Sequence, residues 1–517
     1  MTNPPLPPDF TPRTLFLEPT SHCNMHCAFC PSDVLRRPKG HLPDETARRF
    51  LGELHALGVK APILLNVLGE PLLNQRVFGY LDLLEEAGQP VTLITNLTLL
   101  GGRSVRAELL GHSNLTLALS LQTATRRSYR LRGYPKLPFR KFFALAEEVI
   151  EDKFRLGSGA RLEVHIASNY VLAHDPTVQA DGRLDLWRNF RSEAAERRFV
   201  GRTLRRLDRL AGTMEKKYGP AFAAERDRAA AVYKDHLWTR IVADRASLPA
   251  DFHRLKDDVF WGYMALPNVF LVFKSLELWT RDPAFLKAAL PPDRFVYLEE
   301  RDEPRTCLMA DSFGLLANGD FVLCCLDYEG EMKIGNIAEM TVERALASAK
   351  RASVRADAMS EAVCRRCKGT LFVFETKPLA GAEQAVDKFG RGWWDFEPTL
   401  HGLGGRWTKG LAWAYVFARI PGRRVRLSYF SPHEDGAALE LRLSAGDPGG
   451  DGFSPAAVFA LPSVRGVPQE FEAAFDFTPG RLYRVEVASP TFVPDESLGN
   501  GDLRTLVLAV SSLALRR

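Results

Sequence analysis

Three cysteines within eight residues constrain this chain more than any other feature of its sequence. Cys23, Cys27 and Cys30 stand at C-x3-C-x2-C spacing, and Phe29 precedes the last of them. Thiolates on one tight loop can hold three irons of a [4Fe–4S] cluster, which leaves the fourth iron open to an outside ligand. The alternative is part of a zinc site, although structural zinc needs four ligands and usually takes them from C-x2-C pairs.

Strand-like stretches alternate with helical stretches from residue 13 onward, which is typical of a parallel α/β architecture. The pattern predicts strands at 14–18, 62–68, 91–95, 115–121, 162–167 and 268–273. Helical periodicity predicts helices at 43–57 and 77–87. The cysteine loop directly follows the first strand. In α/β barrels the active site lies at the carboxyl ends of the strands, which is where this loop stands.

This cysteine loop on a strand end resembles the signature of the radical SAM enzymes, a superfamily with a partial (β/α)6 TIM-like barrel. The resemblance implies that Cys23, Cys27 and Cys30 hold a [4Fe–4S] cluster whose open iron binds S-adenosylmethionine (SAM). It also implies reductive cleavage of SAM to a 5′-deoxyadenosyl radical, with electrons from a reductant such as flavodoxin or ferredoxin. In relatives the residue before the third cysteine packs beside the adenine, and an aromatic residue such as Phe29 suits that place.

Two more strand ends match family motifs in part. Leu68-Gly69-Glu70-Pro71 is similar to the Gly-Gly-Glu-Pro segment that binds the SAM ammonium. Glu70 would accept from that cation and Gly69 would allow close backbone approach; the alternative is a plain strand-to-helix turn. Thr95-Asn96 resembles the Thr-Asn-Gly stretch of relatives, with Leu97 in place of the glycine, and makes Asn96 a candidate cofactor contact.

The fourth and fifth strands end in weaker matches. Ser120-Leu121-Gln122 stands where relatives often have Ser-x-Asp, and the resemblance implies that Ser120 reaches the ribose or carboxylate of SAM. After the fifth strand Asn169 is a candidate cofactor contact, although only Ile166 matches the family motif there. A solvated loop residue is the alternative for Asn169.

The segment 173–267 is rich in Arg, Ala and Glu, and we expect it to be a mostly helical insertion in the barrel. One βα connection does not normally need so many residues. As a lid or wall over the barrel mouth it could bring arginines to an anionic substrate. A solvated helical face with ordinary charge pairs is the favoured interpretation.

A second set of cysteines follows the barrel. Cys307, Gly319 and Cys324, followed by Cys364 and Cys367, resemble the SPASM auxiliary-cluster module or its shortened twitch form. No further cysteine follows, so the resemblance implies one auxiliary [4Fe–4S] cluster held by the four cysteines, with zinc as the alternative because four thiolates suit it equally.

The remaining cysteine, Cys325, has three interpretations. It could replace Cys324 as a ligand, or act as a catalytic hydrogen-atom donor to a substrate radical. A buried neighbour without chemistry is the third and favoured interpretation.

Composition changes after about residue 376, where Gly and Pro separate short alternating segments. Such segments predict a β-sandwich of about 120 residues. The stretch 492–510 resembles the end of a jelly-roll module found on bacterial glycan-building enzymes. It points to sugar or other glycan-related chemistry, while a packing or dimerisation domain is the alternative.

Charge and hydropathy exclude several classes of function. The 68 basic and 63 acidic side chains leave a net charge of +5, too balanced to indicate nucleic-acid binding. No apolar run reaches the roughly 20 residues that cross a bilayer, and no signal peptide is evident, so we expect a cytoplasmic protein without membrane contact. The grouped cysteines also suit a reducing compartment and metal ligation.

The chain is therefore predicted to be a radical SAM enzyme acting on an unidentified substrate. A sugar or small molecule is favoured over a peptide, because no peptide-recognition module is evident; oxidoreductase, epimerase and maturase chemistry all stay open. A non-catalytic cluster scaffold is the alternative class. The expected domains are a tail (1–13), the barrel (14–305), the auxiliary domain (306–376), a linker (377–395) and the β-sandwich (396–517).

Overall fold

The computed structural model divides the chain into two compact units, each described here by itself. The first unit spans Met1–Phe285 and Glu300–Gly369, and the second spans Leu286–Glu299 and Thr370–Arg517. The structure describes residues 11–134, 136–167, 171–174, 187–230, 239–242, 245–249, 260–274, 276–277, 285–286, 290, 292–301, 303–367, 369–397, 404–409, 411–448, 452–491, 506 and 508–517.

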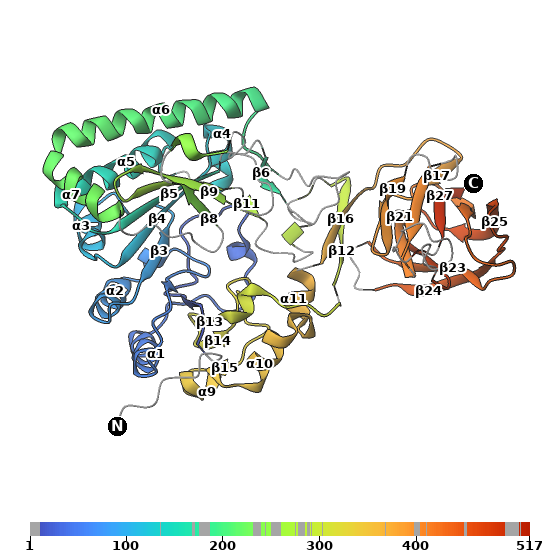
Figure 1. Cartoon of the computed structure of the whole chain (residues 1–517), viewed down its shortest axis with the longest axis horizontal. Helices are drawn as coiled ribbons and strands as arrows, with labels where there is room; N and C mark the ends of the chain where they lie inside the picture. Colours follow the sequence, from blue (N-terminus) through green and yellow to red (C-terminus); the bar gives the residue numbers. More distant parts are fainter. Residues whose placement is uncertain are drawn as a thin grey trace, which may run out of the picture. The chain divides into compact units, whose positions relative to one another are not determined.

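A large mixed sheet organises the first unit (Figure 1). Its central strands are β1 (Thr14–Leu17), β2 (Ile63–Leu64), β3 (Val91–Thr95), β4 (Leu115–Gln122), β5 (Arg161–Ala167) and β10 (Val269–Lys274). They pair in that order and each neighbouring pair is parallel. This confirms the predicted α/β class and the six parallel strands of a partial barrel, whose carboxyl ends all meet at one edge.

Helices cover the central strands because their apolar residues recur on one face. The helices of this region are α1 (Asp44–Ala56), α2 (Val77–Glu86), α3 (Arg103–Gly111), α4 (Arg126–Tyr129) and α5 (Phe139–Leu156). In α1, for example, Phe50, Leu51 and Leu54 are fully buried, as their i, i+1, i+4 spacing predicts. The helices therefore fix the strands while leaving the strand ends free to build a site.

The sheet continues beyond the barrel strands on both sides. Beside β1 it adds β13 (Ser312–Leu315), β14 (Asp320–Val322) and β15 (Gly335–Asn336), and β13 runs parallel to β1. Gly319 has φ +86° and lies in the turn between the antiparallel strands β13 and β14. The auxiliary segment is thus joined to the barrel by backbone hydrogen bonds, and its helices are α9 (Val342–Leu346), α10 (Ala349–Ala356) and α11 (Ala362–Cys367).

The region expected to be a helical insertion contains both helices and strands. Its helices are α6 (Glu193–Lys217) and α7 (Gly219–Ala230), and its strands are β6 (Val171–His174), β7 (Trp187–Arg188), β8 (Thr239–Val242) and β9 (Phe260–Leu266). β9 pairs antiparallel with β10, and β11 (Leu276–Glu277) pairs with β6.

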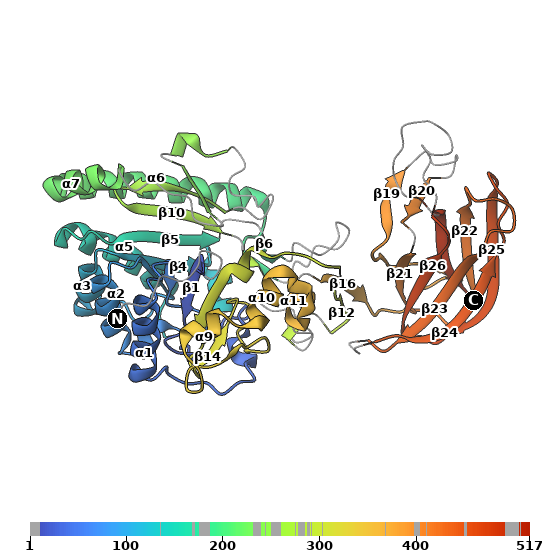
Figure 2. The same ribbon diagram turned by 60° about the horizontal axis from the view of Figure 1, so that its bottom comes forward.

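Helix α6 lies along the outside of the barrel. Arg206 and Lys217 of α6 form ion pairs with Glu147 and Glu151 of α5. Figures 1 and 2 show α6 and α7 running side by side along one layer of the unit. These contacts match the charge-paired helical face that we favoured over a lid.

The second unit is built of β-strands, as Figure 2 shows. One sheet contains β17 (Glu383–Ala385), β19 (Trp393–Glu397), β20 (Gly405–Thr408), β22 (Gly422–Phe430), β25 (Pro468–Phe477) and β27 (Ala509–Arg516); the other contains β18 (Lys388–Phe389), β21 (Leu411–Phe417), β23 (Leu439–Gly446), β24 (Ser454–Leu461) and β26 (Leu482–Ala488). The pair β12 (Arg294–Glu299) and β16 (Thr370–Glu375) completes the unit.

Alternating side chains of these two sheets form the core of the second unit, with Leu427, Leu441 and Val485 fully buried in it. This is the sandwich that the alternating segments predict. The stretch 377–395, expected to be a linker, contributes β17 and β18 to the sheets instead. Most of the jelly-roll-like stretch 492–510 lies outside the described residues.

No helix in the described part of the chain is long and apolar enough to cross a lipid bilayer.

Candidate active site

The three N-terminal cysteines lie on a loop at the carboxyl end of β1. The Cys27 and Cys30 thiols are within electrostatic reach of each other and of Cys23. The backbone N–H of Cys30 donates to the carbonyl of Cys27 at 2.9 Å, which closes the loop into a tight turn. The structure therefore brings together the three residues that the spacing singled out.

The surroundings of the three thiols favour the protonated form when no metal is bound. Burial raises the pKa of Cys23 above its ordinary value, that of Cys27 to about 11 and that of Cys30 to about 12. Metal binding replaces these protons, because only the thiolate is a ligand. Three thiols on half-buried residues of one loop fit a [4Fe–4S] cluster with one open iron.

The described side chains do not form a site for a single metal ion such as zinc. Across the residues that the structure describes, no three His, Cys, Asp or Glu side chains converge closely enough to hold one metal ion. The thiolates of a four-iron cluster each bind a different iron and stand farther apart than the ligands of one zinc ion.

Arg132 is a site residue that the sequence interpretation missed. It is 2% exposed, and its charge lowers the pKa of Cys23, Cys27 and Glu70. Its Nη1 donates to Oε1 of Gln122 at 2.7 Å, whereas its buried Nε has no hydrogen-bond partner in the structure. A buried guanidinium with an unsatisfied N–H next to the cysteine loop is suited to an anionic group of a bound cofactor.

The signal that could have revealed Arg132 is the glycine after it. Gly133 has φ +60°, and a Cβ there would lie 2.4 Å from the carbonyl oxygen of His26. The segment before it runs along the cysteine loop: the His26 N–H donates to the Arg132 carbonyl at 3.2 Å, and the Ala28 N–H to that of Leu131 at 2.8 Å. Only glycine permits this approach.

Glu70 follows β2 and lies next to the end of β3. The residue is buried, with 1% of its surface exposed. Its carboxylate accepts from the Asn96 backbone N–H at 2.7 Å, from Thr95 Oγ1 at 2.8 Å and from the Leu72 N–H at 3.3 Å. Burial, the dominant cause, nevertheless raises its pKa to about 7. An ammonium group placed against it would restore the charged form, so the geometry suits the predicted role.

Gly69 holds the turn before Glu70 against the cysteine loop. Its φ is +82°, and a Cβ would lie 2.3 Å from the Thr20 carbonyl oxygen and 2.8 Å from that of His22. Gly69 therefore allows a close backbone approach to the segment leading into Cys23.

We expect Gly69→Ala to prevent correct closure of the cysteine loop, because backbone atoms cannot yield as a side-chain tip can. The expected result is loss of about four irons per chain, the content of one cluster, with the second unit still folded. Iron analysis after anaerobic reconstitution measures this. Gly58→Ala is the control, since Gly58 also has a positive φ (+71°) but no atom within 4 Å of an added Cβ; equal iron in both variants would contradict the account.

The other predicted cofactor contacts have different surroundings. Asn96 donates through Nδ2 to Asn24 Oδ1 at 2.9 Å and to Cys23 Sγ at 3.7 Å, so it ties the end of β3 to the cysteine loop. Ser120 is buried on β4. Phe29 packs with Ala167 beside Cys27 and Cys30. Asn169 lies outside the described residues.

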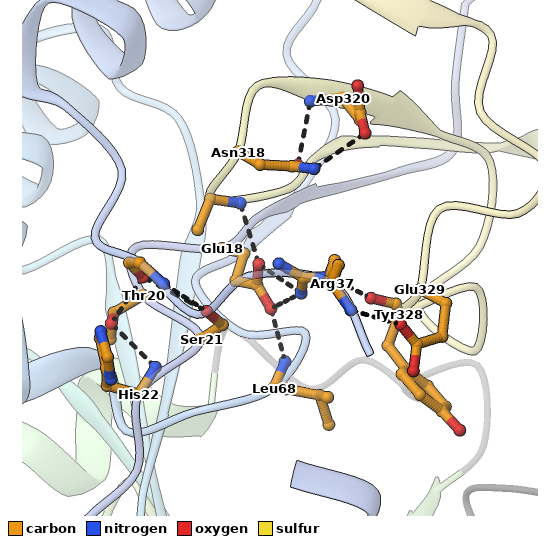
Figure 3. A network of polar contacts seen from close by, with 12 residues as sticks. Glu18, Thr20, Ser21, His22, Arg37, Leu68, Asn318, Asp320, Tyr328 and Glu329 are labelled. Carbon is orange, nitrogen blue, oxygen red and sulfur yellow. Dashed lines mark hydrogen bonds and ion pairs between the residues drawn. The ribbon is translucent and has the colours of Figure 1, made fainter. Parts of the chain in front are cut away.

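A buried ion pair links the cysteine loop to the auxiliary segment (Figure 3). Arg37 Nη2 lies 2.6 and 2.7 Å from the two carboxylate oxygens of Glu18, and Glu18 is fully buried at the end of β1. The same carboxylate accepts from the Leu68 N–H at 3.2 Å and from the Ala317 N–H at 2.9 Å. Glu18 therefore joins four segments around the site, one of them from the auxiliary part of the chain.

The four cysteines assigned to the auxiliary cluster also meet in space. Burial raises the pKa of Cys364 to about 12, and the nearby thiols of Cys324, Cys367 and Cys307 add to this effect. Two of the four sit on one short helix, α11, and Cys324 follows β14. This donor set fits a second cluster.

Cys325 packs against a different apolar cluster from Cys324, although the two thiols lie within hydrogen-bond reach of each other. Cys324 contacts the main core of the first unit with Cys307 and Cys364, whereas Cys325 contacts a smaller apolar cluster of Phe16, Leu68 and others that Cys30 also contacts. Its charge still interacts with Cys367. The side chain thus faces the region between the two cysteine sets.

Comparisons with known proteins agree with these two sites. Residues 17–159 match the sequence model of the radical SAM superfamily, and residues 307–368 match the SPASM iron–sulfur cluster-binding domain. A curated relative, the AdoMet-dependent heme synthase of Methanosarcina barkeri, is 37% identical over 90 residues, which are 17% of this chain and 25% of the relative. The chain thus matches about a quarter of the length of that relative.

Two solved structures are also similar. BtrN in complex with AdoMet and 2-DOIA has a TM-score of 0.32 at 13% identity, covering 69% of this chain and 92% of BtrN. Streptococcus suis SuiB bound to S-adenosylmethionine has a TM-score of 0.37 at 16% identity, covering 70% of this chain and 73% of SuiB.

A parallel barrel with a cysteine loop after β1, joined to a second cysteine set, defines the class of iron–sulfur enzymes that use SAM. Residues 17–159 are accordingly a radical SAM segment, and residues 307–368 are a SPASM iron–sulfur cluster-binding segment. The cofactors of the chain are therefore a SAM-binding [4Fe–4S] cluster, SAM and an auxiliary cluster.

Proposed function

We propose that this chain reductively cleaves SAM and uses the product radical to abstract a hydrogen atom from a sugar or another small molecule. The observation that carries the proposal is the convergence of Glu70, Asn96 and Arg132 on the loop of Cys23 and Cys27. A cysteine scaffold that served only to bind metal would not need a buried carboxylate and a buried guanidinium beside its thiols.

In this proposal Cys23, Cys27 and Cys30 hold the first cluster, and Cys307, Cys324, Cys364 and Cys367 hold the auxiliary one. When bound and reduced, the first cluster supplies an electron to the sulfonium of SAM, which yields methionine and a 5′-deoxyadenosyl radical.

The residues around that cluster bind and orient SAM. Glu70 accepts from its ammonium group, and Arg132 donates to its carboxylate. Phe29 packs against the adenine, and Ser120 binds the ribose or carboxylate. Asn96 holds the cysteine loop in place, and Cys325 faces the space between the two clusters as a candidate hydrogen-atom donor.

Glu70 gives the proposal a dependence on pH. Its folded pKa of about 7 is higher than the ordinary value of 4.5, so burial of its charge costs stability that appears as pH rises from about 4.5 to 7. Above pH 7 this cost is roughly 3 kcal/mol. Glu70→Gln is expected to raise the thermal midpoint of the SAM-free protein at pH 8 and to change it little at pH 5.

The same variant is expected to bind SAM at least 10-fold more weakly at pH 8, since a charge-assisted hydrogen bond is worth about 1.5–3 kcal/mol. Calorimetric titration with SAM measures this effect. Glu53→Gln on α1 is the matched control, because Glu53 pairs with Arg49 away from the site. Equal SAM affinity of Glu70→Gln and the parent chain would contradict the assigned role.

The substrate class is tested by how a compound changes SAM cleavage. Sugars, nucleotide sugars and short peptides are added to the reduced, reconstituted protein, and 5′-deoxyadenosine is measured against the rate without addition. Stimulation by a sugar-containing compound, with deuterium passing from it into 5′-deoxyadenosine, supports the proposal. Stimulation by peptides alone would assign the chain to peptide maturation.

A further inference from the structure

Four arginines surround one open pocket in the first unit. The pocket has a volume of about 480 Å³ and is lined by Arg126, Arg127, Arg130 and Arg191. All four side chains are exposed. Volumes of 300–1,000 Å³ are typical of small-molecule sites, so the pocket has room for a ligand, and every described residue that lines it is an arginine.

These arginines stand on a rigid part of the fold. Arg126 and Arg127 begin α4, whose N-cap Thr125 forms a capping box with Ser128 at 3.0 and 3.1 Å. Arg191 follows Asn189, which is 1% exposed. Asn189 Nδ2 donates to the Ala167 carbonyl at the end of β5 at 2.9 Å.

Two more hydrogen bonds fix the same loop from the other side. The Ala124 N–H donates to Asn189 Oδ1 at 3.2 Å, and Thr125 Oγ1 donates to the Asn189 carbonyl at 3.1 Å. The two arginine-bearing segments are therefore joined over the carboxyl ends of β4 and β5, at the edge of the sheet that carries the cysteine loop.

Among the described residues, the pocket arginines lack the acidic partners that other arginines of this unit have. Arg206 pairs with Glu147, Arg155 with Asp152 and Arg245 with Asp208. Within the described part of the chain, no ion pair involves any of the four pocket arginines. Like charges held together repel each other, so their convergence on a concave surface is best explained by an anion that binds there.

We propose that this pocket binds the phosphate or diphosphate group of the substrate, which makes the substrate a phosphorylated small molecule such as a sugar phosphate or a nucleotide sugar. This inference rests on the proposed function and specifies its substrate. Guanidinium groups match phosphate oxygens in pairs, and four of them around one pocket suit a group with two or more negative charges. The next segment along the chain, Arg130–Arg132, also runs along the cysteine loop, so a ligand held here lies near the cluster.

Inorganic pyrophosphate is the probe for the test, with the reconstituted full-length chain. Calorimetric titration at low ionic strength is expected to show binding that weakens as salt is added, because the pocket is exposed. Arg127→Ala/Arg191→Ala is expected to weaken binding at least 10-fold. Arg127→Lys/Arg191→Lys keeps the charge but loses the paired N–H geometry. Its affinity for pyrophosphate is expected to lie between that of the parent chain and that of the double-alanine variant.

Arg202→Ala/Arg205→Ala is the matched control, since it removes two exposed arginines from α6 outside the pocket. It should leave pyrophosphate binding unchanged; a loss equal to that of the pocket variant would overturn the inference by showing a general charge effect. Tighter binding of an acidic peptide than of pyrophosphate would overturn the assigned ligand class.

The test separates this inference from the proposed function. A parent chain that forms 5′-deoxyadenosine but does not bind pyrophosphate would overturn the pocket and leave the function. A chain that binds pyrophosphate in this pocket but never forms 5′-deoxyadenosine would support the anion site and overturn the function.

Discussion

Replacing Cys23 with alanine is expected to reduce 5′-deoxyadenosine formation to background. The loop would then keep two of its three thiols, which are too few to hold the cluster. Iron should fall by about four per chain, the content of one four-iron cluster. Because Cys23 is on a loop rather than in the centre of the core, the circular dichroism spectrum and the second unit should be unchanged.

Cys364→Ala provides the contrast for this result. It removes a proposed ligand of the auxiliary cluster and should also lower iron by about four per chain. It leaves the SAM-binding loop intact, so 5′-deoxyadenosine should still form when dithionite supplies the electrons. Normal SAM cleavage by the Cys23 variant would refute the assignment of the cysteine loop.

The second large effect is expected at the ion pair of Glu18 and Arg37. Arg37→Met keeps most of the side-chain volume but leaves the fully buried carboxylate of Glu18 without its counter-charge. Breaking a buried pair in this way costs about 3–5 kcal/mol. We expect the free energy of unfolding of the first unit to fall by that amount in denaturant titrations.

Cluster content should fall with it, since Glu18 also accepts from Leu68 before Gly69 and from Ala317 in the auxiliary segment. Arg48→Met is the control: Arg48 pairs with Asp44 on the exposed face of α1, where an ion pair contributes little. The double variant Glu18→Gln/Arg37→Met should recover part of the lost stability, because it removes both charges. Equal stability of the two single arginine variants would contradict the role given to the buried pair.

Much of the barrel could be predicted because its strands and helices follow local patterns. Residues 91–95 were expected as a strand and form β3, and 43–57 contain α1. The second strand is shorter than the predicted 62–68, since β2 ends at Leu64 and the chain turns toward Gly69. The strand β9 was missed inside a segment of helical composition, although Pro267-Asn268 is a turn signal and Asn268 has φ +55°.

The cysteine ligand sets could be proposed from spacing and resemblance, because ligands on one loop are close in sequence. Arg132 was missed, since it meets Cys27 across 105 positions; Gly133 marks a close backbone approach at this point, but only the fold shows that the cysteine loop is what it approaches. The buried pair of Glu18 and Arg37 is also a product of tertiary packing. The conformation of Leu97 could not be predicted from its residue type either. It adopts φ +70°, where the family motif has glycine, and its side chain is fully buried.

The central claim is that the cysteine loop holds a cluster that cleaves SAM, and one measurement tests it most directly. The protein is reconstituted without oxygen, iron and sulfide are counted, and 5′-deoxyadenosine is measured after dithionite and SAM are added. The account predicts about eight irons per chain, from two four-iron clusters, together with 5′-deoxyadenosine. A chain that takes up no iron and forms no 5′-deoxyadenosine would contradict it.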